Sequence, residues 1–116
     1  MTSPTDALRD FLAPLLPGWR FQFGRWTDTS KTSRFAVLKP AGGLPLELVR
    51  RPNFTLTFIG AFDEPSQVPL AAAETVIAAM QADTTNPLGM QPGEPAFFST
   101  DDGRAVFELA ISTISD

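Results

Sequence analysis

Carboxylates are the main side chains in this 116-residue sequence that could carry acid–base or metal chemistry. The sequence has no histidine, cysteine or tyrosine. Catalytic arrangements of the Ser-His-Asp or Cys-His kind are therefore impossible, and the commonest transition-metal ligand is missing. Asp101 and Asp102, which stand directly before Gly103, are the adjacent acids that we consider as a candidate pair of metal ligands. An EF-hand calcium loop would need further oxygen ligands at alternating positions and a closing glutamate, and neither follows this pair.

A tight turn explains the same two acids better. The Asp-Gly step supplies the positive φ that a hairpin turn requires. The neighbouring Glu94 and Glu108 add carboxylates, but nothing separates the environments of these acids in the way that acid–base catalysis demands. We therefore expect a solvated acidic face in this part of the chain, with no metal, no cofactor and no enzymatic activity.

Aromatic and basic residues alternate near the N-terminus in a pattern that single-strand nucleic-acid binders also show. Trp19 and Trp26 could stack on bases, with Arg20 and Arg25 beside them. The whole chain is acidic, however, with a net charge of −4 and a pI near 4.6. Its acidic second part would repel a phosphate backbone. We expect Trp19 to belong to the core and Trp26 to lie at the edge of a loop.

Charge is distributed unevenly along the chain. Up to Arg51 there are eight basic and four acidic residues, whereas from Pro52 onward Arg104 is the only basic residue among nine acids. Arg50 and Arg51 stand directly before the clearest strand of the sequence. They either protect the end of a sheet strand with charge, or bind carboxylates across a protein interface, as arginine commonly does.

The periodicity of apolar residues predicts the elements that position these side chains. The order predicts an α+β fold, with one mixed or antiparallel sheet of about five strands and two helices mainly on one face. The length suits one domain over residues 1–116. The expected elements are a helix at 5–13, strands at 19–26, 34–40 and 53–62, a helix at 70–83, and hairpin strands at about 96–99 and 104–114.

Three connections lack periodicity. The polar segment 27–33 is expected to be an exposed loop or a hairpin tip, and the run "AGGLP" at 41–45 a flexible connection. The segment 84–95 is rich in proline and glycine, and its Leu88 and Met90 have no periodic face to join, so we expect a functional or mobile loop. No apolar run approaches the roughly 20 residues of a membrane span, and the N-terminal residues do not resemble a signal peptide.

Two long runs carry a family resemblance. "FAVLKPAGGLPLELVRRPNFTLTFIGA" and "QPGEPAFFSTDDGRAVFELAISTI", with the alanine-rich helix between them, resemble the tail terminator (tail completion) proteins of long-tailed, lambda-type bacteriophages. The resemblance covers nearly the full length and includes no catalytic signature. It implies a structural virion protein made in the host cytoplasm. Such proteins form a ring of six at the head-proximal end of the tail tube, stop tube polymerisation and join the tail to the head connector.

The resemblance also implies partners and interface residues. The expected partners are further copies of the chain, the tail tube protein and the head–tail connector protein, with DNA only passing through the lumen and no membrane contact. Arg50 and Arg51 would bind acids of a neighbouring subunit or of the tube, with Asp101 and Asp102 as acidic candidates. Leu88 and Met90 would pack on another subunit or on the tube, and segment 27–33 would line the lumen, face a partner or remain an ordinary exposed tip.

Two other functions are compatible with the same composition. A secretion-type chaperone is also small, acidic and α+β, and a domain with a ligand pocket could use the same helix-on-sheet architecture. The oligomeric state would separate them, because chaperones of that type are dimers whereas terminators are rings.

Overall fold

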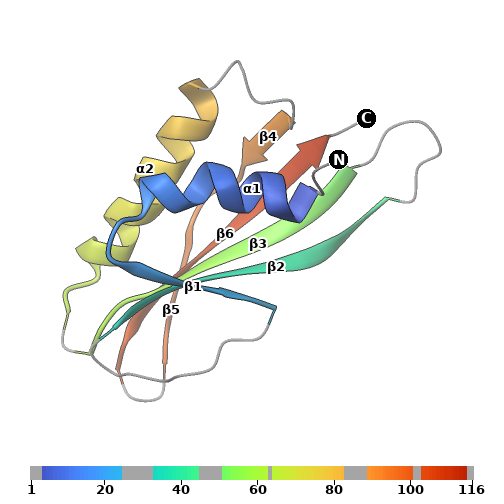
Figure 1. The fold of residues 1–116 in the computed structure, drawn as a ribbon. Coiled ribbons are helices and arrows are strands. Elements are labelled where there is room, and N and C mark those ends of the chain that lie inside the picture. The colour runs from blue at the N-terminus through green and yellow to red at the C-terminus, as the bar shows by residue number, and fades with distance from the viewer. Residues whose placement is uncertain are drawn as a thin grey trace.

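The computed structural model describes residues 4–24, 33–44, 51–62, 64–82, 89–100 and 103–114. It shows an α+β fold with two α-helices and a six-stranded mixed sheet (Figure 1), which confirms the expected fold class and adds one strand to the expected number. The elements are α1 (Pro4–Leu12), a short 3-10 helix (Ala13–Leu15), β1 (Trp19–Phe23), β2 (Arg34–Leu44), β3 (Arg51–Ile59), α2 (Gln67–Ala82), β4 (Gly89–Pro92), β5 (Ala96–Ser99) and β6 (Ala105–Ile114).

The strands follow the order β1-β2-β3-β6-β4, and β5 also pairs with β6. β1 runs parallel to β2, and every other pairing is antiparallel. β4 and β5 therefore lie one after the other along the same side of β6. Between them the N–H of Gly93 donates to the carbonyl oxygen of Ala110 at 2.7 Å, which continues the ladder across the break.

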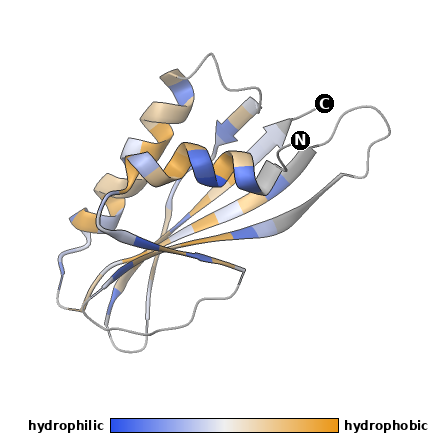
Figure 2. Cartoon of the chain, viewed as in Figure 1, coloured by the Kyte–Doolittle hydropathy of each residue, from blue (hydrophilic) through white to orange (hydrophobic). Residues whose placement is uncertain are grey.

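Both helices pack on one face of the sheet, where they bury the main core (Figures 1 and 2). Apolar side chains at every second residue of the strands form one layer of this core. Apolar side chains three or four residues apart in the helices form the other layer. Each large apolar side chain buried here stabilises the fold by about 1.5–3 kcal/mol relative to an exposed position. The buried members are Leu8, Leu12, Leu16, Ala36, Leu38, Phe54, Leu56, Phe58, Ala72, Ala73, Val76, Met80, Leu109 and Ile111.

Each helix presents a narrow apolar stripe to the sheet. In α1, Leu8 and Leu12 lie one turn apart and are completely buried. Pro14 lies in the 3-10 turn that follows, as expected where a proline limits the helix. In α2 the buried stripe includes Ala73 and Val76, and the small alanine lets the helix lie close to the strands. This helix begins at Gln67, three residues before the start expected from its apolar pattern.

Four sequence-based expectations need correction. β2 continues through "AGGL" to Leu44 with an irregularity between Pro40 and Gly43, so this run is strand and not a flexible connection. β3 begins at Arg51 and ends at Ile59, earlier than the expected 53–62. The segment 84–95 contains strand β4, because an edge position tolerates its proline and glycine. The parallel pairing of β1 and β2 excludes a tight hairpin tip at 27–33, a segment of which the structure describes Ser33 alone.

The predicted C-terminal hairpin is confirmed. β5 and β6 pair antiparallel, with Ser99 opposite Ala105. The N–H of Thr100 donates to the carbonyl oxygen of Arg104 at 3.0 Å, and the N–H of Gly103 donates to that of Thr100 at 3.0 Å. Gly103 has a φ of 84°, the left-handed conformation that its position in the turn requires.

The opposite face of the sheet carries a second, smaller cluster next to a buried charge. Phe35, Val37, Ile59 and Val106 form the cluster. The side chain of Arg104 is completely buried, with its guanidinium carbon 5.5 Å from the centre of the Phe35 ring. Buried arginine is rare because removing its charge from water is costly, so its hydrogen bonds must be well made.

Those hydrogen bonds join three strand ends. The Nε of Arg104 donates to the carbonyl oxygen of Gly60 at 2.8 Å, just after β3. Its Nη2 donates to the carbonyl oxygen of Ser33 at 2.8 Å, just before β2. Arg104 itself directly precedes β6. One side chain thus connects the same end of all three central strands.

We predict that Arg104→Ala lowers the free energy of unfolding by about 3 kcal/mol or more, because it creates a cavity and leaves buried carbonyl groups without their donors. Urea unfolding followed by circular dichroism measures the loss. Arg20→Ala, which removes an exposed arginine of β1, is the matched control and should change stability by less than about 0.5 kcal/mol. Equal stability of the Arg104 and Arg20 variants would contradict the structural role of Arg104.

Candidate interaction surface

An ion pair links the two oppositely charged parts of the chain within one subunit. The Nε of Arg34 donates to both carboxylate oxygens of Glu64, at 2.9 and 3.1 Å, and its Nη2 donates to Oε2 at 2.6 Å. Glu64 also accepts the backbone N–H of Ala61 at 2.9 Å. The forked geometry of arginine favours this two-pronged contact with a carboxylate. It fixes the start of β2 against the turn that leads from β3 to α2.

The electrostatics of the pair follow from these contacts. The hydrogen bond from Arg34 holds the pKa of the Glu64 carboxyl below its ordinary value, and the backbone N–H of Ala61 lowers this pKa further. The same hydrogen bond raises the pKa of Arg34. The side chain of Glu64 is 19% exposed and that of Arg34 is 40% exposed, so solvent screens part of the attraction. The pair is a structural clamp at the surface, with both members charged at neutral pH.

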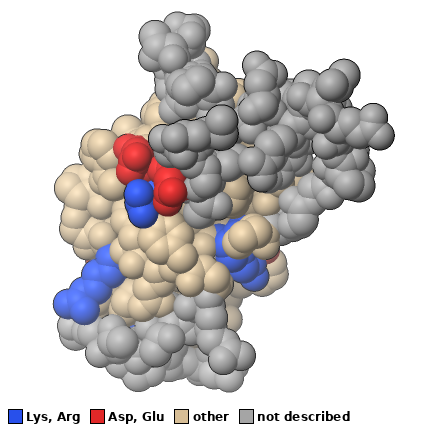
Figure 3. All heavy atoms as spheres, turned by 45° about the vertical axis from the view of Figure 1, so that its right-hand side comes forward, with Lys and Arg blue, Asp and Glu red and all other residues tan. Residues whose placement is uncertain are grey.

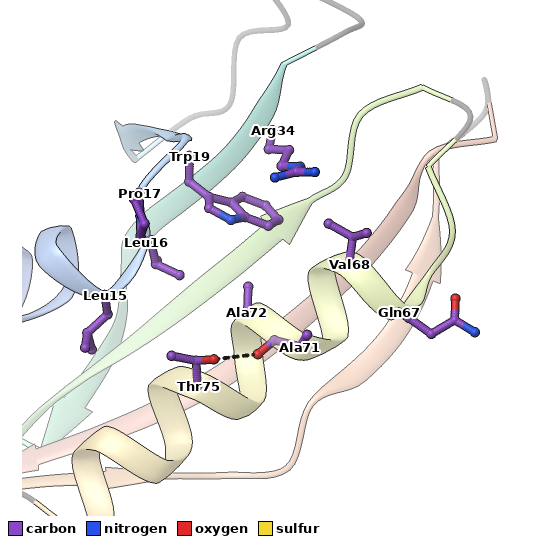
Figure 4. Close-up of a pocket in the computed structure, with 10 residues that line it drawn as sticks. All are labelled: Leu15, Leu16, Pro17, Trp19, Arg34, Gln67, Val68, Ala71, Ala72 and Thr75. Carbon is purple, nitrogen blue, oxygen red and sulfur yellow. Dashed lines mark hydrogen bonds between the residues drawn. The ribbon is translucent and has the colours of Figure 1, made fainter.

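A groove of about 390 Å³ opens beside Arg34, between the 3-10 turn and the first half of α2 (Figure 4). Trp19 extends into it, and its ring meets Phe58 edge-on at 5.7 Å between centroids. The hydroxyl of Thr75 donates to the carbonyl oxygen of Ala71 at 2.9 Å, within the same helix. Because the remaining lining is mostly aliphatic, the groove suits packing of an apolar group and offers no arrangement for catalysis.

Trp19 therefore does not form a base-stacking platform. It is half-buried and packs against the main core, as expected from the sequence. Its position also places the guanidinium carbon of Arg34 at 6.0 Å from the centre of its ring. Trp26 and Arg25, the other members of the nucleic-acid hypothesis, lie outside the described residues.

Two further hollows flank the central strands. One, of about 530 Å³, lies next to the Arg34–Glu64 pair and is bordered by Gly18 and Arg20. The other, of about 300 Å³, lies on the face of the sheet opposite the helices, where Lys39, Glu108 and Phe98 border it. Within the described ranges, no group of three or more acids could hold a metal ion. No helix in the described part of the chain has the length and apolarity needed to cross a membrane.

Most of the interface residues expected from the sequence lie outside the described part of the chain. These are Arg50, Leu88, Asp101 and Asp102. Arg51 is the first residue of β3, and its backbone lies opposite Leu44. Met90 lies in β4 opposite Thr113 and is half-buried against the main core, so this residue does have a face to join within its own subunit.

Sequence reasoning missed three features of the surface. Glu64 clamps Arg34 across 30 positions of the chain, a contact that leaves no local signal in the sequence. Arg104 was treated as one of the charged residues of the surface, whereas its side chain is buried. Its position directly before an apolar strand was the sequence feature that could have indicated this burial. Phe97 and Phe98 lie in the expected strand at 96–99, but both side chains are exposed. Adjacent residues of a strand point to opposite faces, so the helices on one face of the sheet cannot cover both side chains.

The buried position of Arg104 strengthens the charge asymmetry of the surface. Arg104 is the only basic residue after Pro52, and its side chain is buried. The second part of the chain therefore exposes no positively charged side chain. On the face drawn in Figure 3, the coloured side chains of the described charged residues form no large patch of a single sign.

The Arg34–Glu64 pair makes stability dependent on pH in the acidic range. Because the pKa of Glu64 is lower in the folded protein than its ordinary value of 4.5, the contribution of the pair is complete above that value. It is lost as the pH falls through the lowered pKa. We predict that Glu64→Gln costs about 1 kcal/mol at pH 7 and that the difference from the wild type shrinks below pH 4.5.

Urea unfolding of both proteins between neutral and acidic pH measures this difference. Glu74→Gln, which changes an exposed acid of α2, is the control and should alter stability by less than about 0.5 kcal/mol. A difference between wild type and Glu64→Gln that stays constant on acidification would show that the ion pair does not stabilise the fold.

A comparison of the sequence with family models identifies the family of this chain. The model of a family described as phage tail termination protein matches residues 1–116. No curated protein sequence matches the chain. The family is structural and non-enzymatic, its members are components of the phage tail, and their function implies contact with the tail tube. With a match over its whole length, the chain belongs to the phage tail termination protein family.

Proposed function

We propose that six copies of this chain form a ring on the head-proximal end of the tail tube. The ring stops tube polymerisation and presents a surface to the head–tail connector protein, and DNA passes through its lumen without sequence-specific contact. Residues 1–116 act as one domain in this assembly. The observation that carries the proposal is the family match over the full chain. It also removes the reasons for a secretion-type chaperone or a ligand-pocket domain.

The charge asymmetry supports a ring of this kind. Subunits in a cyclic ring contact each other through two different surfaces, so one surface can be basic and the other acidic. Eight of the nine basic residues precede Pro52, and nine of the thirteen acids follow Arg51. Arg104 cannot offset the later acids at the surface, since it is buried.

The position of Arg51 in the sheet supports an interface role for the arginine pair. Arg51 and Leu44 form one end of the β2–β3 ladder, and Ile59 and Phe35 form the other. The internal clamps of Arg104 and Arg34 both lie near the second end. We propose that Arg50 and Arg51 bind acids of the next subunit or of the tube, and that Asp101 and Asp102 belong to the acidic surface.

Two further contacts complete the proposal. Leu88 and the exposed part of Met90 pack against another subunit or the tube, and we expect slower hydrogen exchange there in the assembly than in the monomer. The polar segment 27–33 lines the lumen, where small hydroxyl side chains avoid tight phosphate contacts.

Reversing both arginines tests the interface. We predict that Arg50→Glu combined with Arg51→Glu leaves the monomer folded but reduces ring formation and tube capping at least tenfold. Partly desolvated arginine–carboxylate contacts, repeated around a ring, are replaced by repulsion. Electron microscopy with purified tail tubes measures capping, sedimentation measures ring formation, and a circular-dichroism melt reports folding. High salt should weaken wild-type rings in the same direction.

Arg9→Glu combined with Lys39→Glu is the matched control, because it reverses two exposed basic residues elsewhere in the first part of the chain. This variant should still form rings. Normal rings from the Arg50/Arg51 variant would overturn the interface role. An unfolded monomer would assign the two arginines to the fold instead. Failure of the wild-type protein to cap tubes would overturn the proposed function itself.

A further inference from the structure

The sheet has two edges that no described residue covers. β1 forms one edge, and β5 with β4 forms the other. The N–H of Gly24 donates to the carbonyl oxygen of Leu38 in β2 at 2.9 Å. Since backbone groups alternate between the two sides of a strand, those of Phe21 and Phe23 point away from β2.

The same argument applies at the other edge. The N–H of Thr100 donates to Arg104 on the β6 side. Alternation then directs the backbone groups of Phe97 and Ser99 away from β6. Neither residue has a hydrogen-bond partner on that side within the described part of the chain. Each edge therefore offers two outward backbone positions to another strand.

Exposed aromatic side chains are concentrated on these edges. Among the described residues, four large apolar side chains are exposed, and three of them lie in edge strands: Phe23 of β1 at 45%, and Phe97 and Phe98 of β5 at 57% and 51%. Phe97 lies opposite Phe107, with ring centroids 5.3 Å apart on the helix side, and Phe98 lies opposite Val106 on the other face. Open edges that carry apolar side chains normally pair or aggregate, so proteins cover them.

The two edges also differ in charge. Arg20 is exposed in β1. Glu94 is exposed two residues before the start of β5, and Glu108 is half-buried opposite Ala96. A basic edge and an acidic edge on opposite sides of one sheet complement each other between two copies of the chain, but not within one copy.

We propose that β1 of one subunit pairs with β5 of the next subunit, so that the sheet continues around the ring; this inference rests on the ring of the proposed function. The occupant of each edge is a second copy of this chain. β1 is parallel to β2, and the three antiparallel steps from β2 through β3 and β6 make β5 antiparallel to β1. In a ring whose axis runs along the strands, rotating one subunit onto the next does not change the direction of its strands. The β5 of the next subunit therefore runs antiparallel to β1 of the first, and antiparallel ladders are the more stable form.

The dimensions suit a ring with an open centre. The sheet is five strands wide along its main path. Six such sheets, at about 4.8 Å between neighbouring strands, would close a ring on the order of 45 Å across at the level of the backbone. That width leaves room for side chains and a central passage.

Ser99→Pro tests the pairing at its backbone. Proline removes an N–H that points away from β6, so the β5–β6 ladder keeps its hydrogen bonds while the outer edge loses a donor. We expect a folded monomer and at least tenfold fewer rings by sedimentation and electron microscopy. Ser99→Ala is the matched control and should form rings like the wild type.

The outcomes separate this inference from the proposed function. Wild-type rings together with normal rings from folded Ser99→Pro would overturn the edge pairing and leave the terminator ring intact. A wild-type chain that neither forms rings nor caps tail tubes would overturn both. Crosslinking covers the case in which the proline variant fails to fold.

The absence of cysteine in the chain makes crosslinking specific. Arg20 and Ala96 are exposed on opposite edges and on the same face, so Arg20→Cys combined with Ala96→Cys places one thiol at each side of the proposed contact. Four strand steps of about 4.8 Å separate the two edges within a subunit, which is too far for a short bismaleimide. We expect a ladder of covalent oligomers up to six, which neither single-cysteine chain should give. The absence of this ladder in assembled rings would overturn the pairing.

Discussion

The guanidinium group of Arg104 is the interaction on which the arrangement of the central sheet depends. It donates to the carbonyl oxygens of Ser33 and Gly60 and lies over Phe35, while its own residue leads into β6. A buried charge of this kind is tolerated only where its donors are well placed, and any shift of one strand relative to the others would break its hydrogen bonds. The side chain therefore specifies the register of β2, β3 and β6 at one end as well as stabilising it.

That end of the sheet also positions the second helix. After Gly60, Glu64 accepts the N–H of Ala61 and binds Arg34, which closes the turn between β3 and α2 against the start of β2. The turn brings α2 onto the face where α1 already lies, and both helices then bury the same core. With both helices on one face, the described part of the molecule leaves the sheet edges and part of the opposite face uncovered. The surfaces available for assembly are thus a consequence of how the fold is closed.

The elements with strong periodicity could be predicted from the sequence, and the contacts between distant residues could not. The helix around Val76, the strand around Leu56 and the turn at Gly103 depend on local patterns of apolar and turn residues, and all three were found as expected. The parallel direction of β1 depends on long-range pairing, which leaves no local signal. The strand at Met90 was missed because its prolines and glycines are typical of loops, whereas a short edge strand tolerates them.

The candidate site was less predictable because charge alone does not say where a side chain lies. In the sequence, Arg104 and Glu64 cannot be distinguished from charged residues that are exposed to solvent. In the structure, the burial of Arg104 and the pairing of Glu64 with Arg34 give each a structural role. The family was accessible from the sequence because it depends on the pattern of the whole chain. The role of an interface residue such as Arg50 leaves no comparable pattern in the sequence, since it depends on contacts between separate subunits or with the tube.

A ring built from sheet edges has a consequence for how a tail ends. Contacts between two different surfaces of a subunit generate a closed ring when the rotation from one subunit to the next returns to the first subunit. They generate an open filament when it does not. In the proposed ring, β1 of each subunit is covered by β5 of its neighbour, so closure occupies both strands and leaves no lateral position beside them for a further copy. Growth could then continue only along the axis. Termination must therefore depend on the two axial surfaces being different, with one matching the tube and the other offering no site for another tube ring. The backbone of Arg51 lies at the end of the β2–β3 ladder opposite to the Arg104 and Arg34 clamps, so in the proposed ring these two ends of the strands would form the two axial surfaces.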